Sequence, residues 1–224
     1  MSCSKDDLAK SCDLCSCKYT PVIAMASHRG RDKIAALNIS GYSCKSVVLR
    51  NFPDNPLGAK WQEAVNQALK LNANPLIILG SDDFLSKTYI KTVTEYMAKG
   101  FDLVGCTSWY TYDVKSKKLY RMRYKNVNQD FPVGSGKAYS ATLIQSMNYK
   151  IFDRTKDRRL DDFGHKNALM CNAKIHLIRE PEILAVKSGF GEMNPTIKYL
   201  QSPNIESVLI KDQEEVFKKF HYVL

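Results

Sequence analysis

The stretch Asn74-Pro-Leu-Ile-Ile-Leu-Gly-Ser-Asp-Asp-Phe-Leu-Ser86 joins a short apolar run to an acidic turn. Residues 76–79 are apolar throughout, which is typical of a strand buried on both faces of a sheet. Two neighbouring carboxylates, Asp82 and Asp83, follow where this strand ends. Because open α/β sheets bind ligands outside the carboxyl ends of their strands, the turn lies where a ligand site is expected.

The acidic turn sits within an alternation of short apolar segments and longer amphipathic ones. This alternation predicts an α/β fold in which a mixed, mostly parallel sheet is flanked by helices. Gly41 and Gly100 mark two of the expected helix ends. We expect strands at 21–27, 45–50, 76–79, 103–108, 174–178 and 183–186, helices at 31–40, 59–71, 86–99, 140–147, 161–170 and 213–220, and a hairpin over 109–124.

The charge of the chain restricts its partners only broadly. The 224 residues carry a formal net charge of +10, which favours binding of nucleic acid, an acidic membrane face or the phosphates of a nucleotide. No apolar run approaches the roughly 20 residues of a membrane-spanning helix. The polar, cysteine-rich start shows no secretory signal. We therefore expect no transmembrane segment and, by default, a cytoplasmic protein.

The acidic turn allows two interpretations. Asp82 and Asp83 can hold a hard divalent cation through oxygen ligands, and such a cation would bridge a diphosphate and neutralise a leaving group. The alternative is structural, because Asp is a favoured residue at the start of a helix and Asp82 would then cap the helix that follows.

The order of motifs favours the first interpretation. Strand, polar loop, strand, loop, helix, strand and Ser-Asp-Asp follow one another as in the first half of the GT-A glycosyltransferases, and the chain resembles the inverting family that includes many polysaccharide and capsule enzymes. In this family the apolar strand runs into Asp-x-Asp-Asp, whereas Gly80 stands here for the first Asp. The resemblance implies a GT-A-like fold and a Mn²⁺ or Mg²⁺ ion bound by Asp82, with Asp83 as a helper.

The resemblance also assigns residues to a nucleotide-sugar donor. The loop 26–31 resembles the one that holds the base and ribose, and residues after the second strand would meet the base edge. Lys60 occupies the place of a basic residue near the donor phosphates, although a mobile surface lysine is the alternative. The donor contacts implied in this way are Ser27, Arg29, Arg31, Asn51, Asp54, Lys60, Ser81, Asp82, Gly136 and Lys187.

A second acidic pair, Asp161 and Asp162, stands at the start of an expected helix in a segment that resembles the acceptor side of the family. Inverting transfer needs one carboxylate to take the proton of the acceptor hydroxyl. We assign Asp162 as this base and expect Asp161 to contact donor or acceptor hydroxyls. The alternative is an ordinary acidic helix start, since carboxylates are stabilised near helix N-termini.

These motifs predict a glycosyltransferase that moves a sugar, most simply from a UDP-sugar, to a hydroxyl of a glycan or glycoprotein, with inversion. A nucleotidyltransferase is one alternative, but the loop 28–31 is poor in glycine for that chemistry. A basic nucleic-acid-binding domain is another, in which aromatic residues stack on bases. The candidates for this role are Trp109, Tyr110, Tyr112, Tyr120 and Tyr124. We expect no nucleic-acid partner, because these aromatics also suit a sugar subsite.

The ends of the chain lie outside the resemblance. We expect a flexible, cysteine-rich leader over 1–18, a single GT-A-like catalytic domain over 19–200 and a C-terminal extension over 201–224. In the leader, thiolates can bind zinc or remain free. The cysteines concerned are Cys3, Cys12, Cys15 and Cys17.

Overall fold

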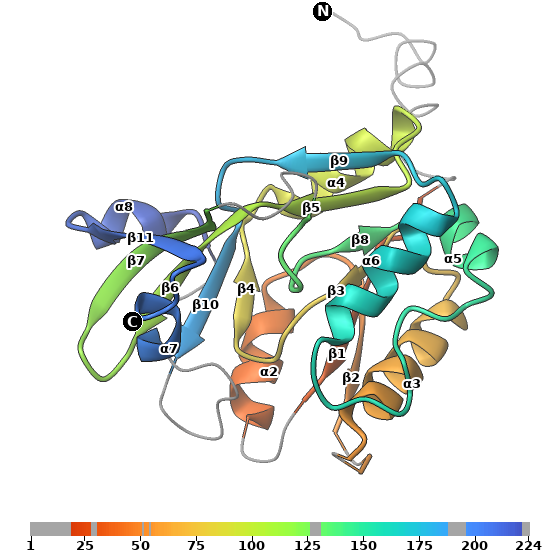
Figure 1. Cartoon of the computed structure of the whole chain (residues 1–224), viewed down its shortest axis with the longest axis horizontal. Helices are drawn as coiled ribbons and strands as arrows, with labels where there is room; N and C mark the ends of the chain where they lie inside the picture. The colour runs from red at the N-terminus through yellow and green to blue at the C-terminus, as the bar shows by residue number, and fades with distance from the viewer. Residues whose placement is uncertain are drawn as a thin grey trace, which may run out of the picture.

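A computed structural model describes residues 19–27, 31–50, 52–53, 55–125, 131–187 and 196–220, without the side chains of Asp32 and Ile197. The expected leader and its cysteines lie outside this part of the chain. Two sheets and flanking helices make up the fold (Figure 1). The α/β class with flanking helices is confirmed, although the strands are divided between two sheets. Within the described residues, no helix is long and apolar enough to cross a membrane.

The first sheet has six strands in the order β2-β1-β3-β8-β5-β9. Its parallel pairs are β1 with β2, β1 with β3, and β5 with β9, while the two-residue strand β8 runs antiparallel between β3 and β5. Five of the six strands match expected segments. Their bounds are β1 Val22–Ala26, β2 Lys45–Leu49, β3 Leu76–Ile78, β5 Leu103–Cys106, β8 Ala138–Tyr139 and β9 Ile175–Ile178.

Helices cover both faces of this sheet. Along β1, Val22 and Ala24 pack in the cluster that includes α3, α5 and α6, whereas Ile23 and Met25 pack in the cluster that includes α2 and α4. Burial on both faces explains why β1 and β3 are apolar without alternation. The bounds are α2 Asp32–Ser40, α3 Leu57–Leu69, α4 Tyr89–Ala98, α5 Ala141–Ser146 and α6 Leu160–Met170.

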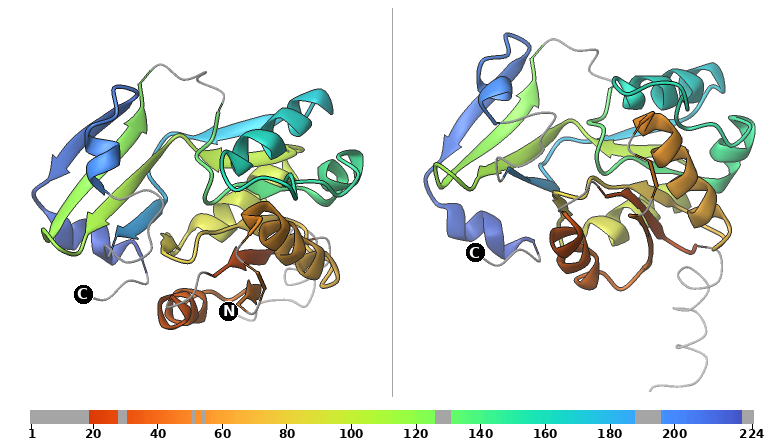
Figure 2. Two further views of the ribbon diagram at one scale, coloured as in Figure 1. Left: turned by 60° about the horizontal axis from the view of Figure 1, so that its bottom comes forward. Right: turned by 90° about the horizontal axis from the view of Figure 1, so that it is seen from below.

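The second sheet has five strands in the order β11-β7-β6-β10-β4. The expected hairpin forms β6 and β7, and β10 lies parallel to β6 and antiparallel to β4. Figure 2 shows the green and blue strands of this sheet beside the orange and red elements of the first. The bounds are β4 Asp83–Leu85, β6 Ser108–Asp113, β7 Lys118–Tyr124, β10 Ile183–Lys187 and β11 Ile205–Ile210, with helices α7 Thr196–Leu200 and α8 Gln213–Lys218.

The acidic turn connects the two sheets. The chain leaves β3 in the first sheet, passes through residues 79–82 and enters β4 in the second. Asp82 therefore does not cap a helix, because α4 begins only at Tyr89 with Thr88 as its first flanking residue. The expected helix start near Ser86 was wrong because residues 83–85 pair with β10, a strand about 100 residues later in the chain.

Candidate functional site

A cavity of about 320 Å³ opens beside the carboxyl ends of β1 and β3 and is lined by residues of both sheets. From the first sheet and its helices come Ala26, Ile78 and Trp61. From the second come Trp109 and Lys187. This position agrees with the rule that α/β sheets bind ligands outside the carboxyl ends of their strands.

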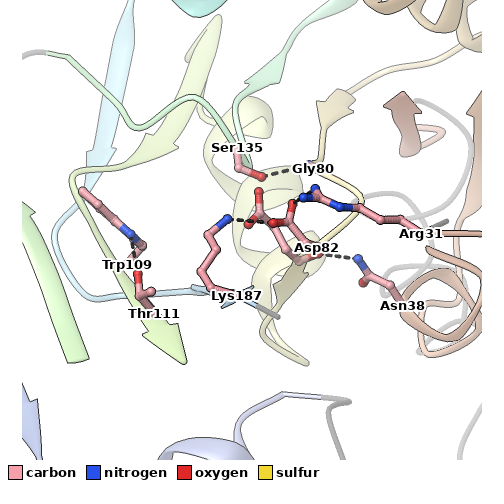
Figure 3. Close-up of polar contacts among 9 residues, drawn as sticks. Arg31, Asn38, Gly80, Asp82, Trp109, Thr111, Ser135 and Lys187 are labelled. Atoms are coloured by element: carbon pink, nitrogen blue, oxygen red, sulfur yellow. Dashed lines mark hydrogen bonds and ion pairs between the residues drawn. The ribbon is translucent and has the colours of Figure 1, made fainter. Parts of the chain in front are cut away.

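Asp82 lies in the wall of this cavity between two cations (Figure 3). The Lys187 ammonium at the end of β10 donates to Oδ2 over 2.7 Å, and Nη1 of Arg31, just before α2, lies 3.2 Å from Oδ1. Their side chains are all nearly buried, with 13%, 10% and 11% exposed for Asp82, Lys187 and Arg31. One carboxylate therefore joins the start of α2 to the last residue of β10.

The two cations decide the charge of Asp82. Burial alone would raise the pKa of this carboxyl, but the charges of Lys187 and Arg31 and the hydrogen bond from Lys187 outweigh it and hold the pKa below its usual value. Burial would likewise lower the pKa of Lys187, yet Asp83 and Asp82 raise it. Asp82 and Lys187 therefore form a charged pair near neutral pH.

Asp83 occupies a different environment although it is the next residue. Burial, and next the charge of Asp82, raise the pKa of the Asp83 carboxyl to about 6. Its Oδ2 lies only 2.3 Å from the point where a Cβ on Gly80 would stand. Ser135 contacts both residues, since its hydroxyl also accepts a hydrogen bond from the Gly80 amide over 3.1 Å. The missing side chain at position 80 thus makes room for the Asp83 carboxylate.

The second acidic pair stands in the first turn of α6. Asp161 lines the cavity, with its Oδ2 packed against Gly134, whereas Asp162 is not among the lining residues. Asp162 accepts a 2.6 Å hydrogen bond from Nε of Arg159, which has a left-handed backbone (φ 55°) before the helix. The two carboxylates therefore face different surroundings.

No family model matches the sequence. No curated protein matches it either. Solved structures of S. aureus TarS 1-349 do match, with a TM-score of 0.54 at 12% identity over 74% of this chain and 60% of that chain. The TarS 1-349 complex with UDP-GlcNAc gives a TM-score of 0.54 at 13% identity over 80% and 64%, and the complex with UDP gives 0.53 at 13% over 75% and 60%.

The chain has a GT-A-like fold. It spans less than two thirds of the length of the TarS chains that it matches. At such low identity the similarity concerns the fold alone.

Within the GT-A-like fold, the residues assigned to the donor do not all reach the cavity. Arg31, Ser81, Asp82 and Lys187 line it. Gly136 is not a lining residue. Its φ is +77°, and a Cβ at this position would meet the side chain of Ile183 in β10. The positions Arg29, Asn51 and Asp54 fall outside the described residues.

Lys60 has a supporting role in place of the expected phosphate contact. Its side chain is buried, and its ammonium donates to the backbone carbonyls of Ser27 and Arg50, which follow β1 and β2. Neither Lys60 nor Ser27 is among the residues that line the cavity. Lys60 thus links the ends of β1 and β2, because a buried ammonium must be matched by acceptors.

The expected divalent cation stays a prediction, and at Asp82 it would meet two cations of the protein. Both carboxylate oxygens of Asp82 already have cationic partners. Among the residues that the structure describes, no group of three or more His, Cys, Asp or Glu side chains could hold a metal ion. A cation bound at Asp82 would compete with Lys187 and Arg31 for the carboxylate and would find two adjacent carboxylates as its protein ligands.

An aromatic wall completes the cavity on the side of the second sheet. Trp109 of β6 lies with its ring centroid 5.2 Å from that of Tyr124 in β7 and 5.7 Å from that of Tyr199 in α7. All three line the cavity. Of the five aromatic candidates that the sequence offered, Trp109 and Tyr124 line the cavity, whereas Tyr110, Tyr112 and Tyr120 do not. The sequence gave no signal for Tyr199, because its helix has only five residues.

Proposed function

We propose that the protein is a glycosyltransferase that moves a sugar from a nucleotide-diphosphate donor, with UDP as the expected nucleotide, to a hydroxyl of a glycan or glycoprotein. The observation that carries this proposal is one cavity in a GT-A-like fold that joins buried cations at Asp82 to a carboxylate, Asp161, and an aromatic wall. Cations suit a diphosphate, and aromatic faces suit sugar rings.

The carboxylate in the cavity supports a direct, inverting displacement. The acceptor oxygen attacks the anomeric carbon, its proton passes to a carboxylate, and the bond from the anomeric carbon to the diphosphate oxygen breaks. The nucleoside diphosphate leaves with the bonding electron pair. We now assign the base to Asp161 in place of Asp162, because Asp161 lines the cavity while Asp162 is engaged by Arg159.

Nucleotide binding and product analysis test the reaction. We expect UDP to raise the melting temperature of the full chain, and a UDP-sugar incubated with a glycan acceptor to release UDP. Release of pyrophosphate from a nucleoside triphosphate would indicate a nucleotidyltransferase. If no nucleoside diphosphate or nucleotide sugar stabilises the protein and none is consumed, the proposal is wrong.

Two matched variants test the base. Asp161→Asn should lower kcat by about 10²- to 10⁴-fold, the usual range for loss of a general base, while leaving UDP binding nearly unchanged. Asp162→Asn, which keeps the same helix position, should cost far less. The reverse order of effects would return the base to Asp162.

A further inference from the structure

The Asp82 carboxylate of the acidic turn is already paired with two cations of the protein. Asp82 places one oxygen against Lys187 at 2.7 Å and the other against Arg31 at 3.2 Å, and all three side chains are nearly buried. Partners held in this way are positioned before any ligand arrives. The cavity therefore contains two fixed positive charges beside its acidic turn.

Both cations lie at the cavity. Arg31 and Lys187 come from opposite sides of the turn, as Figure 3 shows, and both line the cavity. The Lys187 ammonium has three N–H groups, and one of them donates to Asp82. A diphosphate in the cavity can thus meet a positive charge from each side of the turn.

From this geometry we infer that Lys187 and Arg31 bind the donor diphosphate directly and neutralise it as it leaves, so that no divalent cation is required. The inference rests on the proposed glycosyl transfer. Fixed cations can stabilise the developing charge of a phosphate leaving group as a bound metal does. Asp82 is then a positioning residue that holds the two cations, and no metal-binding carboxylate is needed at position 80.

A rival arrangement makes the opposite prediction. If Lys187 and Arg31 only occupy a metal site until the ion arrives, Mn²⁺ would displace them and UDP would bind through the metal. Asp82 would then be essential for binding, and Lys187 would be dispensable. The two arrangements differ in their response to chelation and in which variant is damaged.

Calorimetric titration of the full chain with UDP, in EDTA and in Mn²⁺, separates them. We expect the dissociation constants in the two buffers to agree within about threefold, since the chelator removes nothing that the site uses. UDP binding seen only with Mn²⁺ would overturn the inference while supporting the proposed function. Absence of UDP binding in both buffers would overturn the inference and the proposed function together.

Variants of Lys187 and Asp82 show which side chain binds UDP. In EDTA, Lys187→Met should weaken UDP binding by about 10-fold or more, the scale of a charge-assisted hydrogen bond to phosphate. Lys91→Met removes an equal charge from an exposed helix position and serves as the control. Asp82→Asn should weaken binding less than Lys187→Met does. A larger loss for Asp82→Asn, or no loss for Lys187→Met, would contradict direct binding by the lysine.

A double variant guards against misfolding. Lys187→Met alone leaves Asp82 with one cation fewer in a buried place, and uncompensated buried charge is destabilising. Lys187→Met combined with Asp82→Asn removes both charges while keeping similar side-chain volumes. We expect this folded variant to lose UDP affinity in EDTA as Lys187→Met does. Affinity equal to that of the unaltered protein would overturn the inference.

Discussion

The two sheets differ in how far apart in the sequence their paired strands lie. In the first sheet, β1, β2 and β3 follow one another with α2 and α3 between them, and only the other half of the sheet contains distant pairs such as β5 with β9. In the second, the hairpin β6–β7 is local, but β4 pairs with β10 and β7 with β11, across about 100 and about 80 to 90 residues. Local sequence therefore specifies β1 to β3 of the first region, whereas distant pairings specify both edge strands of the second.

The candidate site depends on both regions. Arg31 precedes α2 beside the first sheet, and Lys187 ends β10 in the second. Asp82, in the short connection between β3 and β4, holds them together. Neither sheet alone would place two cations on one carboxylate, so changes far from the cavity can reach it by loosening either region.

The largest expected effect comes from opening the core of the second sheet. Phe84 in β4 is fully buried and packs with Leu184 and Phe217. Phe84→Ala should reduce the free energy of unfolding by about 3–5 kcal/mol, since both transfer energy and packing are lost. Urea unfolding measures this loss. Leu209→Ala, at a half-exposed position of β11, should change stability by less than about 0.5 kcal/mol.

Urea unfolding can also show whether the two regions unfold together. The chain has two tryptophans, Trp61 in α3 of the first region and Trp109 in β6 of the second. Trp61→Phe and Trp109→Phe variants leave one fluorescent probe in each region. We expect both probes to report one transition, because the regions share the cavity. Separate transitions would mean that the sheets unfold independently.

The contrast between the regions also explains which helices and strands could be predicted from the sequence. The strands β1, β2 and β3, the C-terminal ends of α2 and α4, and the hairpin β6–β7 all follow local patterns and were predicted. The strands β4 and β11 were missed, because three residues at 83–85 and six residues at 205–210 without clear alternation become strands only through distant partners.

The same limit applies to the site. Sequence order placed Arg31, Asp82 and Lys187 among the donor contacts, and these line one cavity. It could not show that the last two form an ion pair, because 105 residues separate them. It also placed Lys60 near phosphate, whereas its ammonium donates to the backbone carbonyls of Ser27 and Arg50.

The buried Lys137 should make the stability of the protein depend on pH. Lys137 is buried, its ammonium donates to the Asp161 carbonyl over 3.1 Å and lies 4.8 Å from the Phe131 ring centroid. Burial lowers the pKa of Lys137 to about 8 from 10.5, against the opposing charges of Asp161 and Asp162. The unfolded chain therefore binds more protons between these two values, and raising the pH favours the folded state.

The size of this effect follows from the shift. From about pH 8 to 10.5, the protein should gain up to about 3 kcal/mol of stability relative to Lys137→Met, at about 1.4 kcal/mol per pKa unit. Below pH 8 the contribution is lost. Urea unfolding of both proteins across this range measures the difference. Lys91→Met, at an exposed position, should follow the unaltered protein, and a flat difference for Lys137→Met would contradict its lowered pKa.

The two tryptophans should contact different substrates, Trp61 the UDP donor and Trp109 the acceptor. Trp61 lines the cavity from α3 and Trp109 from β6. Trp61→Phe should weaken UDP binding and Trp109→Phe should raise the KM for the acceptor, each by roughly 3- to 10-fold, the scale of one aromatic contact. Titration with UDP and acceptor kinetics measure the two effects. Equal effects of both variants on UDP would show that the regions do not separate donor from acceptor.

The smallest expected effect lies at the outer edge of the second sheet. Arg123 of β7 and Glu206 of β11 face each other in register, with Nε and Oε2 2.6 Å apart and side chains 63% and 41% exposed. A double-mutant cycle of Arg123→Ala and Glu206→Ala should give a coupling energy of about 0.2–1 kcal/mol that declines with salt. Backbone pairing over six residue pairs already joins these strands. A coupling above about 2 kcal/mol would mean instead that a single ion pair holds β11, and that the distant pairings which define this region depend on side-chain charge.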